Sequence, residues 1–383
     1  MRRTRDAPAN QEVGMRVVVV GASGNVGTAV LAALAVEPVV TSLVGVARRV
    51  PRAGGASTVD FPHDAASWVR LDVTAGGADD VVDRLAGVMA GADTVVHLVR
   101  TPRRRTSARD RRTGDVEAAR RVFAAAGRAG VRHVVAASCT GAYAASGGDE
   151  PRVESWPVRG GDTSGSAPWA RAENADGTSA ATDRPMTATA EVERLLVRLS
   201  AEHPVVVTSV RSPIVLHRRG ASQLVRDVVG RLPSVPLRKD GTVPVVLWPE
   251  GLRVQVVHAD DLAQAYRRIV VQRQPGAFNI AASDVLDGQT FADVVSGGRL
   301  RPIPEQVARM SLSSAKALGV APVDARWLDT LFDSPVLDTT LARAILHWAP
   351  QHDARSALEE IVAGIRDGAG AQTPPLLPLR PTD

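Results

Sequence analysis

The stretch that decides the fold is VVVVGASGNVGTAV, residues 17–30. Four valines in a row indicate a buried strand, and the small and apolar residues that follow indicate a helix. Three glycines, Gly21, Gly24 and Gly27, lie between the two. Such a triplet allows a tight turn, lets a pyrophosphate approach the backbone, and lets helix and strand pack closely. The segment predicts a dinucleotide-binding loop, with a plain strand-to-helix turn as the alternative.

The first turn of that helix is the expected phosphate site, because helix N-termini carry free N–H groups and a partial positive charge. The expected contacts from the loop are Gly21, Ser23, Gly24, Asn25, Val26 and Gly27. The expected contacts from a later strand end are Asp72 and Val73, near the adenine.

The end of the second expected strand bears on the choice of cofactor. NAD sites usually carry an acidic residue roughly twenty positions after the glycines, where it binds the ribose diol. Here GVARRVP places Arg48 and Arg49 in that neighbourhood. Arginines pair well with phosphate groups, so NADP is favoured over NAD. In a chain this rich in arginine, two solvated surface residues are the competing interpretation.

The composition sets further bounds. The chain has 383 residues, 44% of them hydrophobic, which suffices for a large core. Aromatic residues make up only 3%, so base-stacking platforms for nucleic acid are not expected. The single cysteine excludes an internal disulfide and fits a reducing cytoplasm. We find neither a signal-peptide core nor an apolar run long enough to span a bilayer, so no membrane association is expected.

Further short apolar runs alternate with helical patterns after the glycine loop, which predicts a parallel, doubly wound α/β sheet. Several of them have recognisable motifs, in this order: ADTVVHLV at 92–99, VVAASCTGAYA at 134–144, VESWP at 153–157, VRSPIVL at 210–216, VQVVHADDLAQAY at 254–266 and GAFNIAASD at 276–284. Together with GASGNVG they resemble, over about residues 15–365, the NAD-dependent epimerase/dehydratase family of the extended short-chain dehydrogenase/reductase superfamily.

The resemblance implies a Rossmann fold with a smaller, mainly helical C-terminal substrate lobe. It also implies an NAD(P) cofactor, a small-molecule substrate and a homodimer formed through the helices near Asp115 and Thr189. In the family the end of the fourth strand lies near the nicotinamide half, which implies cofactor contacts for His97 and Leu98, with a purely structural histidine as the alternative for His97. The expected division of the chain is a disordered basic tail at 1–14, an NAD(P)-binding Rossmann domain at 15–281 with an irregular insertion at about 147–184, a helical substrate lobe at 282–365, and a disordered Pro-rich tail at 366–383.

The catalytic helix departs from the family pattern. Family members carry Tyr-x-x-x-Lys before a run like AEVERLL, and aligning on that run in RPMTATAEVERLL, residues 184–196, puts Pro185 at the tyrosine and Thr189 at the lysine. The only tyrosines, Tyr143 and Tyr266, are not followed by Lys or Arg four residues later. In the family the tyrosine exchanges a proton with the substrate and the lysine lowers its pKa. General acid-base help of this kind is worth about 10² to 10⁴ in rate, so the usual route is not expected here.

Substitutes for the lost pair lie after the fifth expected strand. The family's catalytic serine or threonine corresponds to one of Ser138, Cys139 and Thr140, and matching the downstream Tyr143 favours Cys139, with Thr140 next. Cys139 could be a nucleophile if a cation lowered its pKa, or simply a small core residue. Tyr143 could donate a proton, or pack with its hydroxyl satisfied. The family's asparagine after the fourth strand is matched by Asp115.

Seven arginines lie between Arg100 and Arg112, in a loop that borders the substrate cleft in the family. They could bind an anionic substrate or form a solvated charge run; nucleic acid is a distant third choice. No His, Cys, Asp or Glu grouping has metal-ligand spacing, and His258 with Asp260 and Asp261 fits a strand end and helix cap.

The sequence thus favours an NADP-binding protein that runs a modified reaction on a small polar or anionic molecule of specialised metabolism. The alternative is a catalytically inactive, NADP(H)-binding regulatory or scaffold protein.

Overall fold

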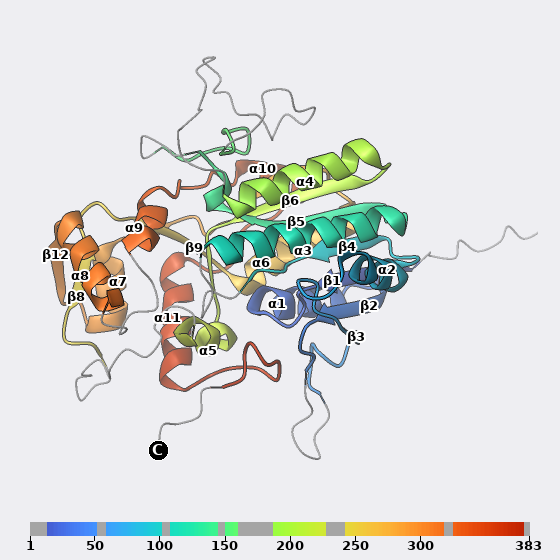
Figure 1. Ribbon diagram of the computed structural model, residues 1–383. Coiled ribbons are helices and arrows are strands. Elements are labelled where there is room, and N and C mark those ends of the chain that lie inside the picture. The colour runs from blue at the N-terminus through green and yellow to red at the C-terminus, as the bar shows by residue number, and fades with distance from the viewer. Residues whose placement is uncertain are drawn as a thin grey trace, which may run out of the picture.

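Seven parallel strands form the central sheet, in the order β10-β6-β5-β4-β1-β2-β3 (Figure 1). Their bounds are β1 Met15–Val20, β2 Val40–Ala47, β3 Ser67–Arg70, β4 Thr94–His97, β5 His133–Cys139, β6 Val206–Ser212 and β10 Gly276–Asn279. The computed structural model describes residues 14–51, 59–101, 108–144, 150–159, 187–226, 242–317 and 325–378. The expected doubly wound α/β sheet is confirmed.

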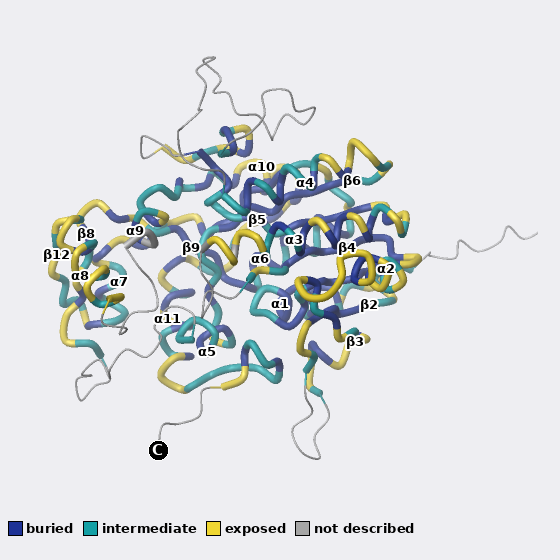
Figure 2. The backbone as a smooth tube through the Cα atoms, viewed as in Figure 1, coloured by how far each residue is buried: buried dark blue, intermediate teal, exposed yellow. Residues whose placement is uncertain are grey.

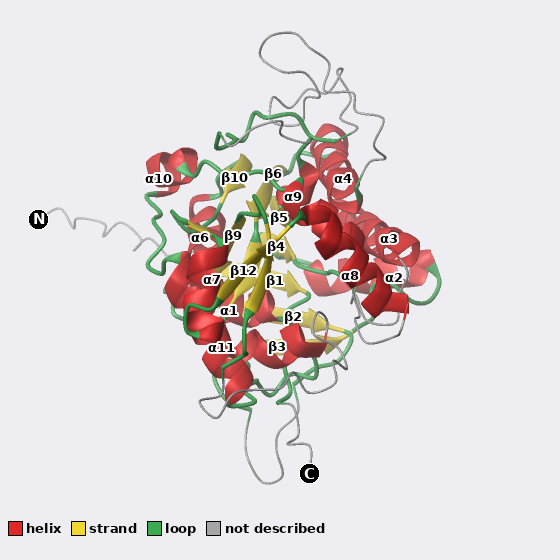
Figure 3. Ribbon diagram, turned by 90° about the vertical axis from the view of Figure 1, so that its left-hand side faces the viewer, coloured by secondary structure: helices red, strands yellow, loops and turns green. Residues whose placement is uncertain are grey.

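The valines of β1 explain why helices cover both faces of this sheet. Val17 and Val19 pack into one core with helices α1, α6 and α10, whereas Val18 and Val20 pack into a second core with α2, α3 and α4 (Figure 3). All four valines are buried, and Figure 2 shows the middle of the sheet buried, whereas the edge strand β3 is partly exposed. A parallel strand covered on both faces has a continuous apolar sequence because neither of its faces meets water. The helix bounds are α1 Asn25–Ala35, α2 Ala78–Met89, α3 Ala108–Arg128, α4 Ala188–Glu202, α6 Ala259–Gln272 and α10 Thr340–Leu346.

A smaller lobe lies beyond the carboxyl ends of the strands (Figure 1). It combines the strand pair β8 (Val246–Pro249) and β12 (Leu300–Ile303) with α7 (Gly288–Ser296), α8 (Glu305–Ala317) and α9 (Ala325–Phe332). A three-stranded sheet of β7 (Ile214–Leu216), β9 (Val254–His258) and β11 (Val285–Leu286) packs under α11 (Ala354–Arg366). Two short 3-10 turns, η1 (Thr140–Ala142) and η3 (Arg218–Gly220), and the short helix α5 (Ala221–Leu224) complete the elements named here.

The expected boundary at residue 282 is therefore not a division in space. β8 precedes that residue but pairs with β12 of the lobe, and α10 follows it but joins the core of the Rossmann domain together with Trp348. Segments on the two sides of residue 282 therefore pack together in space.

The expected disordered C-terminal tail is wrong for residues 367–378. Thr373 and Leu376 are fully buried, and the Thr373 hydroxyl donates to the carbonyl of Ser23 in the glycine loop at 2.8 Å. The Leu376 carbonyl accepts from Ser222. A Pro-rich segment can thus be ordered when its apolar residue is buried and its carbonyls find donors. Residues 1–13 and 379–383, and most of the expected insertion at 147–184, lie outside the described part of the chain.

No helix within the described ranges has both the length and the apolar composition needed to cross a membrane.

Candidate active site

The glycine loop takes the shape that a dinucleotide needs. Gly21 ends β1 with φ at +94°, and a Cβ there would lie 2.9 Å from the carbonyl carbon of Leu98. A Cβ on Gly27 would lie 2.5 Å from the oxygen of Gly21. Both positions therefore require glycine, because the turn and the helix approach leave no room for a side chain.

The N-terminus of α1 is open toward a ligand. Its N-cap is Gly24, which offers no side-chain cap, so the first N–H groups of the helix remain available for an anion. The side-chain oxygen of Asn25 is buried and has no hydrogen-bond partner among the described residues. These features fit the pyrophosphate of a dinucleotide at Gly24, Asn25 and Val26.

The ends of β2 and β3 form the next part of the site. Arg48 and Arg49 are exposed, and the Arg48 Nε lies 4.0 Å from a carboxylate oxygen of Asp72. The other oxygen of Asp72 accepts from the Thr74 N–H and hydroxyl. A hollow of about 470 Å³ borders this group, and Arg48, Arg70, Asp72 and Arg84 are among its lining residues. Val73 itself is buried and faces the core.

His97 and Leu98 lie where β4 ends, beside the glycine loop. The Leu98 N–H donates to the Val20 carbonyl at 2.8 Å. His97 is buried, and burial together with the nearby Arg100 cation lowers the pKa of its imidazole to about 4. His97 is therefore neutral at physiological pH, and its Nδ1 has no hydrogen-bond partner within the described ranges.

Three side chains from three elements meet beyond the end of β5. The Arg100 guanidinium donates to the Cys139 sulfur at 3.2 Å and to the Thr189 hydroxyl oxygen at 3.1 Å. The Cys139 sulfur and the Thr189 hydroxyl are 3.4 Å apart, which closes a triangle. Arg100 is exposed and Cys139 is half-buried, so this group is accessible to a bound molecule. The triangle unites the expected catalytic residue Cys139 with Thr189, the residue aligned with the family's lysine.

The triangle makes Cys139 more acidic than an ordinary thiol. Burial alone would raise the pKa of its thiol, but the Arg100 cation, hydrogen bonds from Thr189 and Arg100, and the Gly141 N–H outweigh burial. The pKa of Cys139 is lowered as a result. A thiolate next to a fixed cation is the reactive form of cysteine.

The neighbours of Cys139 on the chain point elsewhere. The Ser138 hydroxyl is buried and donates to the Glu193 carboxylate. The Thr140 hydroxyl lies 3.3 Å from that of Ser334, on the side of the smaller lobe. Of the three candidates at this strand end, only Cys139 joins the triangle. Asp115 accepts a hydrogen bond from the Thr101 N–H and so holds the backbone next to Arg100.

The structure does not place Tyr143 as a proton donor. It is fully buried, its hydroxyl donates to the Asn279 side chain at 2.7 Å, and burial raises its pKa to about 12. Tyr266 is buried as well, and burial also raises its pKa. The candidate role of Tyr143 as proton donor is therefore corrected, and the alternative holds: its hydroxyl is satisfied in the core, so it has no proton to exchange with a substrate. Pro185 lies outside the described residues.

A buried ion pair that the sequence does not indicate lies behind this strand end. Glu193 of α4 and Arg211 of β6 form a fully buried ion pair at 2.6 Å, and Arg211 also lies over the Tyr143 ring at 4.5 Å. Arg211 donates to the carbonyl of Glu154, in the VESWP segment. The pair fixes α4, and with it Thr189, against the sheet. Arg211 and Glu193 each belong to a quoted motif, but nothing in the sequence pairs them.

Comparison with solved structures agrees with the overall fold. Among solved structures, the chain is similar to MoeE5 in complex with UDP-glucuronic acid and NAD (18% identity, TM-score 0.58, 92% of this chain and 99% of that one). It is also similar to a UDP-glucose 4-epimerase of Thermus thermophilus in complex with NAD (17%, 0.61, 92% and 99%) and to a UDP-glucuronic acid 4-epimerase of Bacillus cereus in complex with NAD (12%, 0.59, 92% and 99%). At these identities the likeness concerns the fold.

No curated protein sequence matches the chain significantly. The sequence profile of the NAD dependent epimerase/dehydratase family matches residues 17–281, most of the chain. The protein therefore belongs to the NAD-dependent epimerase/dehydratase family.

Proposed function

We propose that the protein is an NADP(H)-dependent oxidoreductase, epimerase or dehydratase that acts on a small anionic metabolite, with Cys139, Arg100 and Thr189 in place of the family's usual catalytic side chains. The observation that carries this proposal is the closed triangle of these three residues at the end of β5. An accessible thiol beside a fixed cation can exchange a proton with a substrate, and side chains kept only for packing do not need this arrangement.

Each member of the triangle has a role in proton transfer. A nicotinamide cofactor held at the glycine loop would supply the hydride chemistry. The Cys139 thiolate accepts the proton of a substrate hydroxyl in the oxidative direction, and its thiol returns that proton in the reductive one. Arg100 keeps the sulfur ionised and supplies the positive charge that the family draws from lysine. The Thr189 hydroxyl, which is in contact with both partners, orients them.

The arginines after β2 support NADP(H). Arg48 stands where an acidic residue would bind the ribose diol of NAD, and a 2′-phosphate in the adjoining hollow would meet the Arg48 cation, with the exposed Arg49 next to it along the chain. The three structural neighbours were solved with NAD. A preference for NADP(H) would therefore distinguish this chain from those three structures.

The substrate class follows from charge. The Arg100 guanidinium is exposed beside Cys139, and Arg112 of α3 pairs with Glu191 of α4 at 3.1 Å. An exposed cation beside the proposed reacting group favours an anionic substrate. Two of the neighbours were solved with, or act on, UDP-glucuronic acid, so nucleoside diphosphate sugars with a carboxylate are the first class to test.

The test has two stages with the purified chain. Calorimetric titration with NADP+, NADPH, NAD+ and NADH measures cofactor binding. Nucleoside diphosphate sugars are then added to the preferred oxidised cofactor, and the 340 nm absorbance and product composition are followed. We expect NADP(H) binding and turnover of at least one anionic sugar. Binding without turnover of any member of a broad panel would contradict catalysis, and absence of binding would contradict the whole proposal.

A specific observation favours a second function, that of an inactive NADP(H)-binding regulatory or scaffold protein. The chain has two tyrosines, and both are buried with raised pKa values. No tyrosine can therefore perform the family's proton transfer. This interpretation predicts that Cys139→Ala leaves the cellular function intact while a change that closes the glycine loop abolishes it.

A further inference from the structure

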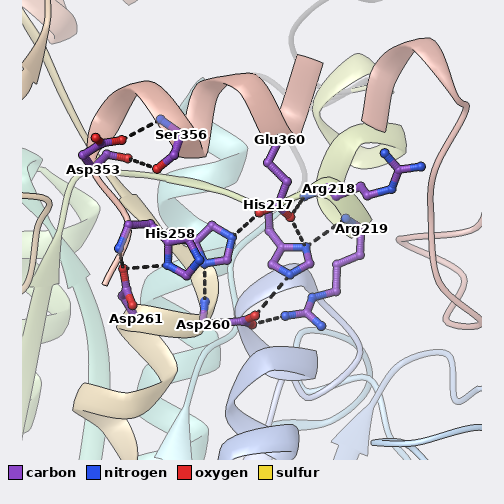
Figure 4. A network of polar contacts seen from close by, with 10 residues as sticks. His217, Arg218, Arg219, His258, Asp260, Asp261, Asp353, Ser356 and Glu360 are labelled. Atoms are coloured by element: carbon purple, nitrogen blue, oxygen red, sulfur yellow. Dashed lines mark hydrogen bonds and ion pairs between the residues drawn. The ribbon is translucent and has the colours of Figure 1, made fainter. Parts of the chain in front are cut away.

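Three histidines and three carboxylates converge where β7, β9, α6 and α11 meet (Figure 4). His217 follows β7, His258 ends β9, His352 precedes α11, and Glu360 projects from α11. The ring centroids of His217 and His258 are 4.9 Å apart, and those of His258 and His352 are 3.8 Å apart. The sequence shows no such cluster, because its members lie up to 143 positions apart along the chain (360 − 217).

The distances within one part of this cluster match a metal site. His258 Nε2 lies 2.7 Å from one Glu360 oxygen, and His217 Nδ1 lies 3.5 Å from the other. One ligand atom from each of the three residues lies within 4.8 Å of the others. Ligands bound tetrahedrally to zinc at about 2.0 to 2.1 Å are separated by about 3.3 Å, so small side-chain movements would suffice.

The surroundings of His217 are those of a metal ligand. Its Nε2 lies 3.3 Å from an Asp260 oxygen, so a carboxylate can orient the ring while Nδ1 faces Glu360. Asp260 is in turn paired with Arg219. Metal binding would replace the hydrogen bond that His217 Nδ1 accepts from the Arg219 N–H at 2.9 Å, and would displace the longer one, 3.3 Å, from the Asp260 N–H to His258 Nδ1.

Two carboxylates of the cluster, those of Glu360 and Asp261, have no arginine or lysine among the ion-pair partners named next, so their charge is compatible with a bound cation. Within the described ranges, the ion-pair partners of Glu360 are His217 and His258, and that of Asp261 is His352. The cluster thus presents two imidazole nitrogens and one carboxylate to a common point.

We propose that His217, His258 and Glu360 bind a divalent first-row metal ion, of which Zn²⁺ fits the donor set best. Two imidazoles and one carboxylate are a known zinc donor set, and water takes the fourth position. The site fastens α11 to the strand ends beside the cofactor loop: a Cβ on Gly364 of α11 would lie 2.7 Å from the Arg218 carbonyl, and one on Gly220 would lie 3.0 Å from the Asn25 side chain. This proposal is independent of the proposed reaction.

The test is a Zn²⁺ titration of the full-length chain without a histidine tag, in competition with a chromophoric chelator. We expect one equivalent to bind, and Glu360→Gln and His217→Asn each to weaken binding at least tenfold. Glu359→Gln and His347→Asn are the matched controls, because Glu359 lies next to Glu360 but pairs with Arg355, and His347 is exposed away from the cluster. Both controls should bind like the unmodified chain.

A second readout guards against misfolded variants. Zn²⁺ should raise the melting temperature of the unmodified chain and of both controls, but not that of Glu360→Gln, whose side chain keeps the same shape. The proposal is overturned if the unmodified chain binds no stoichiometric Zn²⁺, or if Glu360→Gln and His217→Asn bind it as tightly as the controls.

Discussion

The glycine loop after β1 and the side chains after β5 lie at the same edge of one sheet, yet they follow the family pattern to different extents. The loop keeps all three glycines. The region after β5 has Cys139 at the favoured serine position and, in the alignment, Thr189 at the lysine position. Under the proposed function, the loop is the preserved half of the site and the region after β5 is the rebuilt half.

The difference reflects how each half works. The loop acts through main-chain N–H groups and through the absence of Cβ atoms at Gly21 and Gly27, and no other residue can supply that space. The catalytic half needs a proton carrier and a positive charge at given points, which different elements can provide. In the proposed site the charge would come from Arg100, after β4, which contacts Cys139 and Thr189, instead of from α4.

The largest expected effect is on the rebuilt half. Cys139→Ala removes the proton carrier, so kcat should fall by about 10² to 10⁴, while the Kd for the cofactor stays unchanged. Cys139→Ser, which restores the residue type of the family but ionises far less readily, should recover only part of the rate. Steady-state kinetics and calorimetry together check this. Full activity in Cys139→Ala would show that the triangle takes no part in the reaction.

The next effect is on the preserved half. Gly24→Asp has space for its side chain, since the nearest atom to a Cβ there is 3.7 Å away. Its carboxylate would cap α1 and repel the pyrophosphate, so cofactor affinity should fall on the order of 100-fold while the fold gains stability from the new cap. Gly24→Asn, of the same shape without the charge, is the control and should lose less. Equal affinity of both variants for the cofactor would argue against a phosphate at this helix end.

Much of the preserved half could be predicted from the sequence, because a valine run, three spaced glycines and a helix are local patterns. The rebuilt half could not. Arg100 appears in the sequence only as the first of seven arginines, and its contact with Cys139 depends on the ends of β4 and β5 and on α4 lying side by side. Tyr143 looked available because its burial comes from Asn279 and Arg211, far along the chain.

The C-terminal segment contacts the glycine loop, the preserved half of the site. Leu376 is fully buried, and the nearby Thr373 binds the Ser23 carbonyl. Leu376→Ala should lower the free energy of unfolding by about 2 to 5 kcal/mol, measured by urea denaturation. The neighbouring Leu377 is 41% exposed, and Leu377→Ala should cost less than about 0.5 kcal/mol. Similar stability of the two variants would contradict an ordered tail.

The smallest effect concerns the choice of cofactor. Arg48→Ala/Arg49→Ala should weaken NADP+ binding about tenfold, the loss of one or two charge-assisted contacts at the surface, and leave NAD+ binding nearly unchanged. The ratio of the two dissociation constants is the readout. An unchanged ratio would mean that the two arginines are solvated surface residues that do not contact the cofactor.

The ionisation of Cys139 tests the central claim most directly, and it can be measured cleanly because the chain has only this cysteine. The rate of alkylation as a function of pH gives the thiol pKa in the unmodified protein and in Arg100→Gln. The Arg100 cation favours the thiolate, so the pKa should lie below that of a free thiol, about 8.5, and removing the cation should move the curve to higher pH. A pKa at or above the free-thiol value that Arg100→Gln does not shift would contradict the rebuilt catalytic site.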